Sequence, residues 1–211
     1  MSKHAAPARR RWSGALELPI LIVTALLLAV LVKTFLVEAF WIPSVSMVPT
    51  LEVGDRVLVE KVSYRLREPR RGEIIVFHRL DGFGPADEGL PAAARSFFEG
   101  LGLVQPDGDI DLIKRVIGLP GDTVEVRGGR VLINGRRLRE PYAVSDDRDF
   151  PEIRVPRGEL FMMGDNRGAS DDSRFSLGTV DTEVVVGRAF VIMWPPNRAT
   201  NDLVADYPRR R

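Results

Sequence analysis

The sequence contains no cysteine and only two histidines, His4 and His78. Without cysteine the chain cannot form disulfides, use a thiol nucleophile or hold zinc or an iron–sulfur cluster through thiolates. Two histidines leave little for a histidine-based metal centre or a Ser-His-Asp triad. The sequence therefore indicates no metal and no organic cofactor. If the chain is a hydrolase, we expect its proton acceptor to be a residue other than histidine.

An excess of either charge is also lacking, since 30 Lys and Arg stand against 29 Asp and Glu for a net charge of +1. This balance gives no general reason to expect nucleic acid as a partner. With 45% hydrophobic and 28% charged residues, the chain is neither disordered nor a multi-span membrane protein. Its 211 residues allow one globular domain with an appendage, or two small domains.

One long apolar run is present near the N-terminus. Sixteen of the twenty residues Leu18–Val37 are apolar, and Lys33 carries the one charge. About twenty such residues span a bilayer core of about 30 Å. The preceding residues 1–12 contain Lys3 and three arginines but no acid, which places the N-terminus in the cytoplasm. The predicted regions are a cytoplasmic basic tail at 1–15, a transmembrane helix at 16–38 and an extracytoplasmic domain at 39–211.

Two other interpretations of the apolar run remain open. The first is a buried core helix, although Thr24 is the one polar side chain between Pro19 and Val32. The second is a cleaved signal peptide, for which Val37-Glu38-Ala39 offers a small-residue cleavage site. The run is long for the apolar part of a signal peptide, which favours an uncleaved anchor.

The rest of the chain has the pattern of β-structure. Short runs rich in Val and Ile alternate with Gly, Pro and Asp, which is typical of strands and turns. Gly128-Gly129 and Asn134-Gly135 predict tight hairpin turns, which need positive φ at both central positions. Successive hairpins without crossover helices predict a mainly β, antiparallel domain. The predicted strands are Arg56–Val62, Glu73–Phe77, Asp111–Ile117, Thr123–Val126, Arg130–Ile133, Glu159–Met163 and Val184–Trp194.

Three further segments complete the predicted organisation of the chain. Residues 79–109 are rich in Gly and Pro, and we expect a surface insertion with a short helix near Ala92–Phe98 and no assigned chemistry. Residues 122–160 are expected to form a short hairpin region. We expect the tail Arg209–Arg211 to be a solvated end rather than a binding site.

The loop Ile42–Leu51 follows the apolar run and places Ser44 and Ser46 between two prolines. Proline fixes φ and lowers the entropy of the unfolded chain, so this loop should hold its hydroxyls in a defined position. A plainer interpretation is a stiff connector whose serines cap turns.

Strand alternation places Lys114 on the same face as Leu112 and Val116, with Arg115 on the opposite face. If the face of Lys114 is buried, desolvation of the ammonium lowers its pKa. A change from about 10.4 to about 7 corresponds to roughly 4.6 kcal/mol, which full burial can supply. The alternative is an edge-strand lysine that reaches solvent.

The polar stretch Met163–Arg174 is unusual for a simple loop. A calcium loop is disfavoured because the alternating acids and the distal Glu are missing. A polar turn with internal Asx and Ser hydrogen bonds is one interpretation. A more specific one is a network in which Arg174 pairs with a carboxylate and Ser170 orients another side chain.

Taken together, these stretches resemble the bacterial type I signal peptidases, or leader peptidases, which use a serine–lysine dyad. That family has a membrane helix, then Ser-Met-x-Pro-Thr-Leu, Gly-Asp with a strand, Lys-Arg-x-x-Gly-x-Pro-Gly-Asp and Gly-Asp-Asn-x-x-Ser-x-Asp-Ser-Arg. Any one of these motifs is weak evidence, whereas four in the family's order within residues 16–194 are strong. They are found here at Ser46–Leu51, Gly54-Asp55 through Lys61, Lys114–Asp122 and Gly164–Arg174.

The resemblance implies a membrane-anchored serine endopeptidase that removes N-terminal signal peptides from exported preproteins at Ala-x-Ala-type sites. Ser46 would be the nucleophile and a neutral Lys114 the general base. Ser170 would orient the lysine amine, and Ser44 would add a donor to the oxyanion hole beside the Ser46 N–H. The implied partners are signal peptides and the lipid bilayer, with the export machinery nearby. The implied location is the cell membrane, with the catalytic domain on its outer face.

The resemblance also implies supporting residues. Asp172 and Arg174 match positions that are joined by a salt bridge, and Asp165 matches the acid that follows Gly in the same motif. The apolar positions implied to shape pockets for the first and third residues before the cleaved bond are Ile42, Met47 and Leu51.

General chemistry agrees with this assignment. A serine hydroxyl is a poor nucleophile without an adjacent base, and a desolvated lysine is the remaining candidate where histidine is practically unavailable. Acyl transfer also needs fixed donors for the oxyanion, and an extended substrate can pair with an exposed strand edge.

The sequence differs from the family pattern in two places. Three residues, Phe175–Leu177, precede Gly178 where many members have two, which affects the loop rather than the dyad. The stretch Asp122–Gly164 is short, so the large second β domain of some members is expected to be absent or reduced to one or two hairpins.

Two other functions are alternatives to a signal peptidase. An inactive, anchored β domain that binds exported chains or the export machinery would need neither the Ser46 hydroxyl nor the Lys114 amine. Self-cleaving repressors and pilin-type or conjugation peptidases use similar chemistry, but the repressors lack a membrane anchor and carry a DNA-binding region.

Overall fold

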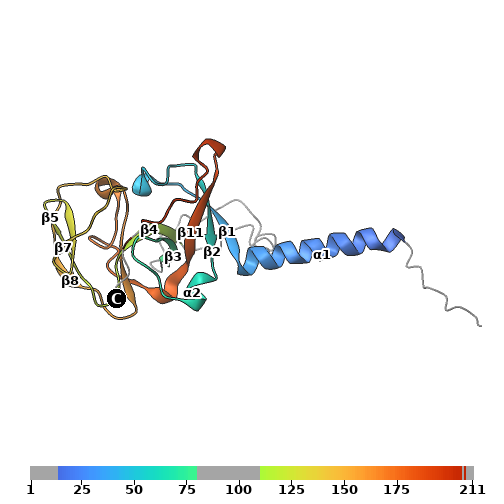
Figure 1. The fold of residues 1–211 in the computed structure, drawn as a ribbon, viewed down its shortest axis with the longest axis horizontal. Coiled ribbons are helices and arrows are strands. Elements are labelled where there is room, and N and C mark those ends of the chain that lie inside the picture. The colour runs from blue at the N-terminus through green and yellow to red at the C-terminus, as the bar shows by residue number, and fades with distance from the viewer. Residues whose placement is uncertain (1–13, 80–109, 206, 208–211) are drawn as a thin grey trace, which may run out of the picture.

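The computed structural model describes residues 14–79, 110–205 and 207, and it consists mainly of antiparallel strands (Figure 1). One sheet has seven strands in the order β1-β2-β11-β3-β4-β9-β10, and a second has four in the order β7-β6-β5-β8. The pairings between neighbouring strands are antiparallel. The predicted mainly β, antiparallel fold is therefore confirmed.

The described residues form eleven strands, two α-helices and four short 3-10 helices. The strands are β1 (Val37–Trp41), β2 (Arg56–Glu60), β3 (Ile74–Arg79), β4 (Ile110–Gly118), β5 (Thr123–Arg127), β6 (Arg130–Ile133), β7 (Arg136–Arg137), β8 (Phe150–Arg154), β9 (Glu159–Met163), β10 (Val180–Asp181) and β11 (Val185–Trp194). The helices are α1 (Gly14–Phe35), α2 (Ser63–Leu66), η1 (Val45–Met47), η2 (Arg167–Ala169), η3 (Thr182–Val184) and η4 (Pro196–Arg198).

The seven predicted strands match β2, β3, β4, β5, β6, β9 and β11 to within a few residues. The central residues of both predicted hairpin turns have positive φ, with 54° and 69° at Gly128 and Gly129 and 53° and 72° at Asn134 and Gly135. Four strands were not predicted. β7 and β10 have only two residues each, β8 contains Pro151, and β1 lay partly within the predicted helix.

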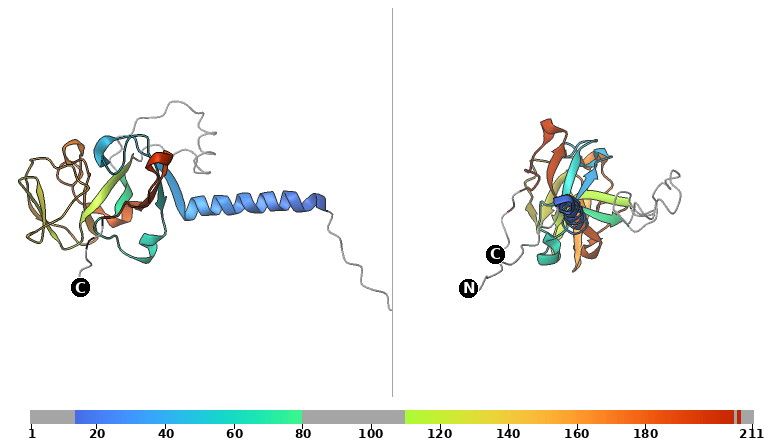
Figure 2. Two further views of the ribbon diagram at one scale, coloured as in Figure 1. Left: turned by 45° about the horizontal axis from the view of Figure 1, so that its top comes forward. Right: turned by 90° about the vertical axis from the view of Figure 1, so that its right-hand side faces the viewer.

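Helix α1 projects away from the two sheets (Figures 1 and 2). Its large apolar side chains from Leu18 to Leu28 are exposed. The interpretation of the apolar run as a buried core helix is therefore wrong. Among the residues that the structure describes, no helix combines the length and the apolar character needed to cross a membrane. The helix ends at Phe35 rather than at residue 38, because Val37–Trp41 pairs with β2.

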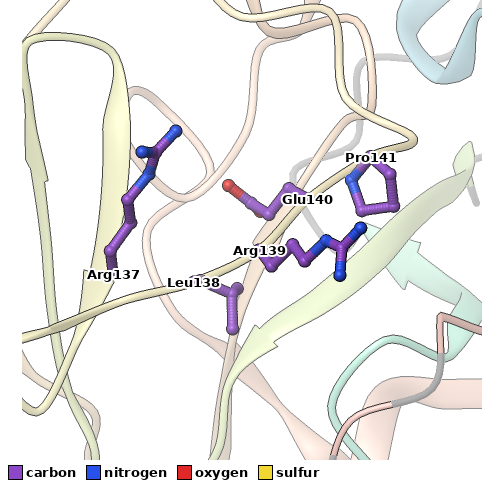
Figure 3. A pocket seen from close by; sticks show the side chains of 5 residues that line it. All are labelled: Arg137, Leu138, Arg139, Glu140 and Pro141. Carbon is purple, nitrogen blue, oxygen red and sulfur yellow. The ribbon is translucent and has the colours of Figure 1, made fainter.

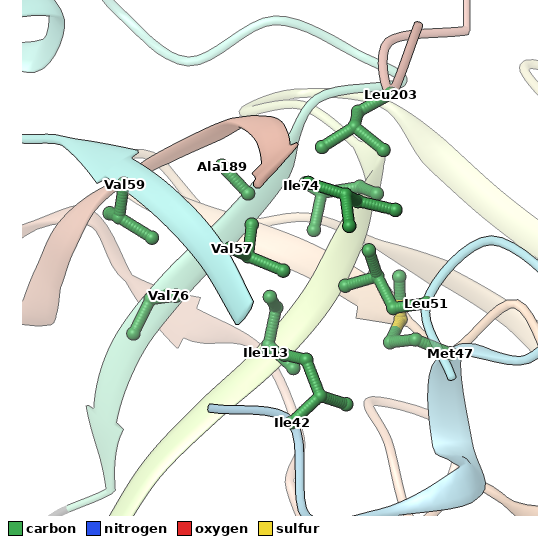
Figure 4. Packing of buried hydrophobic residues seen from close by; sticks show 11 residues of the cluster. Ile42, Met47, Leu51, Val57, Val59, Ile74, Val76, Ile113, Ala189 and Leu203 are labelled. Atoms are coloured by element: carbon green, nitrogen blue, oxygen red, sulfur yellow. The ribbon is translucent and has the colours of Figure 1, made fainter. Parts of the chain in front are cut away.

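Strands β3 and β4 lie in the middle of the larger sheet and are buried on both faces. Along β3, Ile74 and Val76 belong to one hydrophobic cluster, while Ile75 and Phe77 belong to another on the opposite face. Figure 4 shows the first cluster gathered between β2, β3 and β4 and reaching the loop that follows β1. A third cluster joins the smaller sheet to β9. Side chains of β4 therefore lie in the interior of the domain.

Several predicted features lie outside the described residues. They are residues 1–13 of the basic tail, residues 80–109 of the predicted insertion with the short helix at Ala92–Phe98, and the tail Arg209–Arg211.

Candidate active site

Ser46 lies in the short helix η1, and its side chain is 7% exposed. The loop around it is held from both sides. Met47 and Leu51 are fully buried in the first hydrophobic cluster (Figure 4). On the other side, the backbone N–H of Asn166 donates to the Ser46 carbonyl at 3.0 Å, and the Asn166 side chain donates to the Val45 carbonyl at 3.2 Å. The proline-bracketed loop is thus held firmly, as its composition predicts.

Lys114 projects from the centre of β4, where its Cα lies opposite that of Ile75 in β3. Its Nζ lies 3.1 Å from Ser46 Oγ and donates to the Ile113 carbonyl at 3.2 Å. The side chain is only 4% exposed. Burial lowers the pKa of Lys114, although the negative charges of Asp172 and Asp171 oppose part of this effect. The structure therefore brings together a buried amine and a serine hydroxyl that are 68 residues apart in sequence.

Ser44 lies at the entrance to this pair. Its hydroxyl is 3.3 Å from Ser46 Oγ, and its side chain is exposed to solvent. Ser44 and the main chain of η1 therefore lie beside the Ser46 hydroxyl. A carbonyl oxygen on a carbon attacked by Ser46 Oγ would have polar groups of this loop within reach.

Asp172 and Arg174 form the ion pair that the resemblance implies. Arg174 Nε donates to Asp172 Oδ1 at 2.9 Å and Arg174 Nη2 donates to Asp172 Oδ2 at 3.0 Å, and both side chains are buried. Asp172 also accepts a hydrogen bond from the backbone N–H of Gly164 at 3.2 Å. This two-point pairing fixes the planes of both groups and closes the loop between Gly164 and Arg174.

Asp165 is paired with Arg115, a residue to which the sequence assigned no role. Arg115 Nε and Nη2 donate to the two carboxylate oxygens at 2.8 and 2.7 Å, and Thr50 Oγ1 donates to the same carboxylate. Arg115 Nη1 donates to the carbonyls of Gly72 and Leu203 at 2.7 and 2.9 Å. Because Arg115 follows Lys114 directly, this buried network ties the lysine strand to the segment that holds Ser46.

Ser170 follows η2 and has a buried hydroxyl with no hydrogen-bond partner among the described residues. The predicted hydrogen bond from Ser170 to the Lys114 amine is therefore not formed in this structure. Gly164 allows Ser170 to approach, because a Cβ at position 164 would collide with both the Ser170 hydroxyl and the Ser46 carbonyl oxygen. The orienting role of Ser170 stays a prediction.

The three predicted pocket residues, Ile42, Met47 and Leu51, all belong to the first hydrophobic cluster and are at most 2% exposed. Figure 4 shows these three side chains close to one another within the cluster. A hollow of about 410 Å³ lies elsewhere, in the stretch that follows β7, and is lined by Arg137–Pro141 (Figure 3). Neither Ser46 nor Lys114 lines it, so we assign this hollow no part in the reaction.

This arrangement suits nucleophilic catalysis. A neutral amine within hydrogen-bond distance of a hydroxyl can take the hydroxyl proton as the oxygen attacks an acyl carbon. Burial supplies the neutral amine, because desolvation favours the uncharged form.

Comparison with known proteins gives related sequences over most of the chain. The family described as signal peptidase, peptidase S26, has a sequence model that matches residues 15–194. The chain is 45% identical over 175 residues to the signal peptidase I of Leptolyngbya laminosa, covering 82% of this chain and 77% of that protein. It is 41% identical over 197 residues to the probable signal peptidase I-2 of Synechocystis sp., covering 93% of this chain and 79% of that protein. A crystal structure of a signal peptidase I from Enterococcus faecalis aligns with 58% of this chain and 97% of that one, at 31% identity and a TM-score of 0.38.

Proposed function

The chain belongs to the peptidase S26 family of signal peptidases, and on that premise we propose that it is a serine endopeptidase that removes N-terminal signal peptides from exported preproteins. The observation that carries the proposal is the buried Lys114 amine 3.1 Å from the Ser46 hydroxyl. A domain that only binds exported chains would have no need to bury an amine beside a hydroxyl, because burial of that group costs free energy.

In the proposed mechanism, Lys114 Nζ takes the proton of Ser46 Oγ as this oxygen attacks the carbonyl carbon of the scissile bond. The Ser46 N–H and the Ser44 hydroxyl stabilise the resulting oxyanion. Lys114 then gives its proton to the leaving amine, and the same amine activates the water that hydrolyses the acyl-enzyme. Ser170 is proposed to orient the amine during these proton transfers.

The substrate is proposed to bind as an extended chain along β4. Strand β9 pairs with β4 at Arg115–Gly118, and the stretch of β4 that precedes Lys114 leads directly to the reacting pair. Extended peptides add to sheet edges through main-chain hydrogen bonds, with alternate side chains in pockets. The resemblance to the family supports small residues at the first and third positions before the cleaved bond, as in Ala-x-Ala sites.

We expect the protein in detergent to cleave a preprotein directly after an Ala-x-Ala sequence, and the rate to rise with increasing pH. The reason is that only neutral Lys114 can act as a base, and burial lowers its pKa. The rise should therefore be centred below the value of about 10.4 of a free lysine. Mass spectrometry of the products, at a series of pH values, measures both the site and the rate.

A preprotein in which Phe replaces the Ala before the cleaved bond serves as the control and should remain intact. Binding of the preprotein without cleavage at any pH would contradict the proposed function. A rate that stays flat from about pH 5 to 10 would refute the depressed pKa of the lysine base.

The apolar run at residues 16–38 is proposed to anchor the domain to the outer face of the cell membrane. Supporting this proposal, Trp41 and Trp194 are 61% and 54% exposed, and both pair with Arg56 across neighbouring strands. Aromatic side chains of this kind are enriched at the boundary between lipid and water. The anchor would raise the effective concentration of the enzyme near substrates held in the same bilayer.

Replacing both Leu26 and Leu27 by Lys should release the protein from membranes, because each charge at the centre of a spanning helix costs about 2.5–3.5 kcal/mol on insertion scales. The unaltered protein should remain in the membrane pellet after an alkaline wash, as should the control Leu66→Lys, at an exposed position of α2. Recovery of the unaltered protein in the soluble fraction would show that the anchor proposal is wrong.

A further inference from the structure

The segment Glu140–Arg148 runs alongside the loop that holds the catalytic pair. The backbone N–H of Val144 donates to the Asp165 carbonyl at 2.9 Å, and the N–H of Arg167 donates to the Val144 carbonyl at 3.0 Å. These bonds form a parallel bridge between Val144 and Asn166. Asn166 is the residue whose N–H holds the Ser46 carbonyl. Asn166 therefore links this segment to the loop that holds Ser46.

Alternate side chains of this segment contact three buried arginines of the site. Glu140 accepts two hydrogen bonds from Arg167, and the ring of Tyr142 lies 4.0 Å from the Arg115 guanidinium. Asp146 accepts from Arg174 Nη1 at 3.1 and 3.2 Å. A turn at Pro141-Tyr142, closed by the Ala143 N–H donating to the Glu140 carbonyl at 3.2 Å, lets this one short segment reach all three arginines.

Two of these arginines bind carboxylates of the Gly164–Arg174 loop. Arg115 follows Lys114 and binds Asp165, and Arg174 binds Asp172. Each arginine therefore binds a carboxylate of the Gly164–Arg174 loop, which we call its inner partner. Each also contacts a side chain of Glu140–Arg148, which we call its outer partner. A guanidinium held on two sides loses more of its freedom than one held on a single side, so the outer partners restrict how far the inner carboxylates can move.

Both outer partners are themselves fixed. The Tyr142 hydroxyl lies 2.8 Å from the hydroxyl of Tyr207, which donates to the Arg139 carbonyl at 2.9 Å. Asp146 also binds Arg148. Burial alone raises the pKa of Asp146, but hydrogen bonds and charge attraction from Arg148 and Arg174 outweigh burial and lower it. Asp146 is therefore a carboxylate at neutral pH, able to hold Arg174.

We propose that Glu140–Arg148 is a supporting segment that fixes the position of Lys114 relative to Ser46, and that Tyr142 and Asp146 are positioning residues for the peptidase reaction. This inference rests on the proposed function. Neither side chain contacts the reacting atoms, so both act through Arg115 and Arg174. Their loss should lower kcat, because small displacements of a base from its nucleophile are costly, and should leave KM nearly unchanged.

Tyr142→Leu removes the ring under Arg115, and we expect kcat for an Ala-x-Ala preprotein to fall about tenfold with KM within about twofold. The rise of rate with pH should move to higher pH, because a looser site admits water and reduces the desolvation that lowers the pKa of Lys114. Tyr142→Phe keeps the ring and should retain at least about half of kcat. Each rate is divided by the concentration of folded protein, for which circular dichroism gives the folded fraction.

Asp146→Asn provides a second variant that preserves size, and Asp147→Asn is its matched control. Asp147 is the exposed neighbour, so its replacement removes the same charge without touching Arg174. We expect kcat to fall about fivefold in Asp146→Asn and to be unchanged in Asp147→Asn. The two Asp variants are compared with the same preprotein and the same count of folded molecules.

The results separate the two proposals. If the unaltered protein does not cleave, the proposed function fails. If it cleaves, and both Tyr142→Leu and Asp146→Asn keep the full kcat and pH profile per folded molecule, the positioning role is overturned. A loss of folded protein alone, without change in those two quantities, likewise shows that the segment only stabilises the fold. A lowered kcat with the shifted pH profile in Tyr142→Leu supports the inference.

Discussion

Ser46→Ala and Lys114→Ala are each expected to lower the cleavage rate of an Ala-x-Ala preprotein by about 10⁶-fold, the effect of removing the nucleophile or the base of a catalytic triad. Without Ser46 Oγ no acyl-enzyme can form, and without Lys114 Nζ the hydroxyl has no base within reach. Nucleophile and base act as one unit, so the double variant should lose no more activity than either single variant.

Both variants should keep the fold. The Ser46 side chain contacts Ser44 and Lys114 by hydrogen bonds, and neither of these bonds joins two strands. Removal of the buried lysine amine eliminates a polar group that costs free energy to bury. The variant Lys114→Met keeps most of the side-chain volume, so it separates a missing base from a cavity.

The products are analysed by mass spectrometry, and folding is checked by circular dichroism. Lys114→Met should be as inactive as Lys114→Ala if the amine itself is required. Cleavage that persists in both the Ser46 and the Lys114 alanine variants would rule out the proposed pair.

The face of β4 on which Lys114 lies was predictable from a local pattern, whereas burial of that face was one of two open interpretations. Strand alternation places the lysine beside Leu112 and Val116, and the structure buries this face of β4. The hairpin turns were predictable for a similar reason, since Gly-Gly and Asn-Gly are sequences that tolerate positive φ at both positions. In each case neighbouring residues along the chain determine the outcome.

The role of Arg115 could have been inferred, although its partner could not. The same alternation places it between Ile113 and Ile117, and a charged side chain on a buried face needs a partner. Its partner Asp165 is 50 residues away, and no local pattern specifies which carboxylate closes the contact. The family motif named Asp165 as a site residue but did not join it to Arg115.

The segment Glu140–Arg148 carried no usable signal. It has little regular hydrophobic alternation, and its bridge at Val144 belongs to neither sheet. Its side chains contact arginines that belong to other segments, so these contacts exist only once the tertiary fold is formed. The same holds for β1, whose apolar residues continue the run of α1 and become a strand because β2 lies beside them.

Asp165→Asn is expected to lower the free energy of unfolding by about 3–5 kcal/mol, the usual cost of leaving one member of a buried ion pair without its partner. Arg115 is 1% exposed and would lose its carboxylate partner, leaving Thr50, two backbone carbonyls and the single amide oxygen to accept its hydrogen bonds. The amide would also turn an N–H₂ donor toward one of the guanidinium nitrogens. Thermal or urea unfolding followed by circular dichroism measures the change.

The matched control is Glu125→Gln, which breaks the ion pair of Glu125 with Arg127 on β5. Arg127 is 72% exposed, so solvent screens this pair and its loss should cost at most about 1 kcal/mol. A cost for Asp165→Asn as small as that of the control would show that the Arg115–Asp165 pair does not hold the site together. A large cost means that the charges which position Lys114 and Ser46 also stabilise the fold. Loss of this ion pair would then displace the base and lower the free energy of unfolding at the same time.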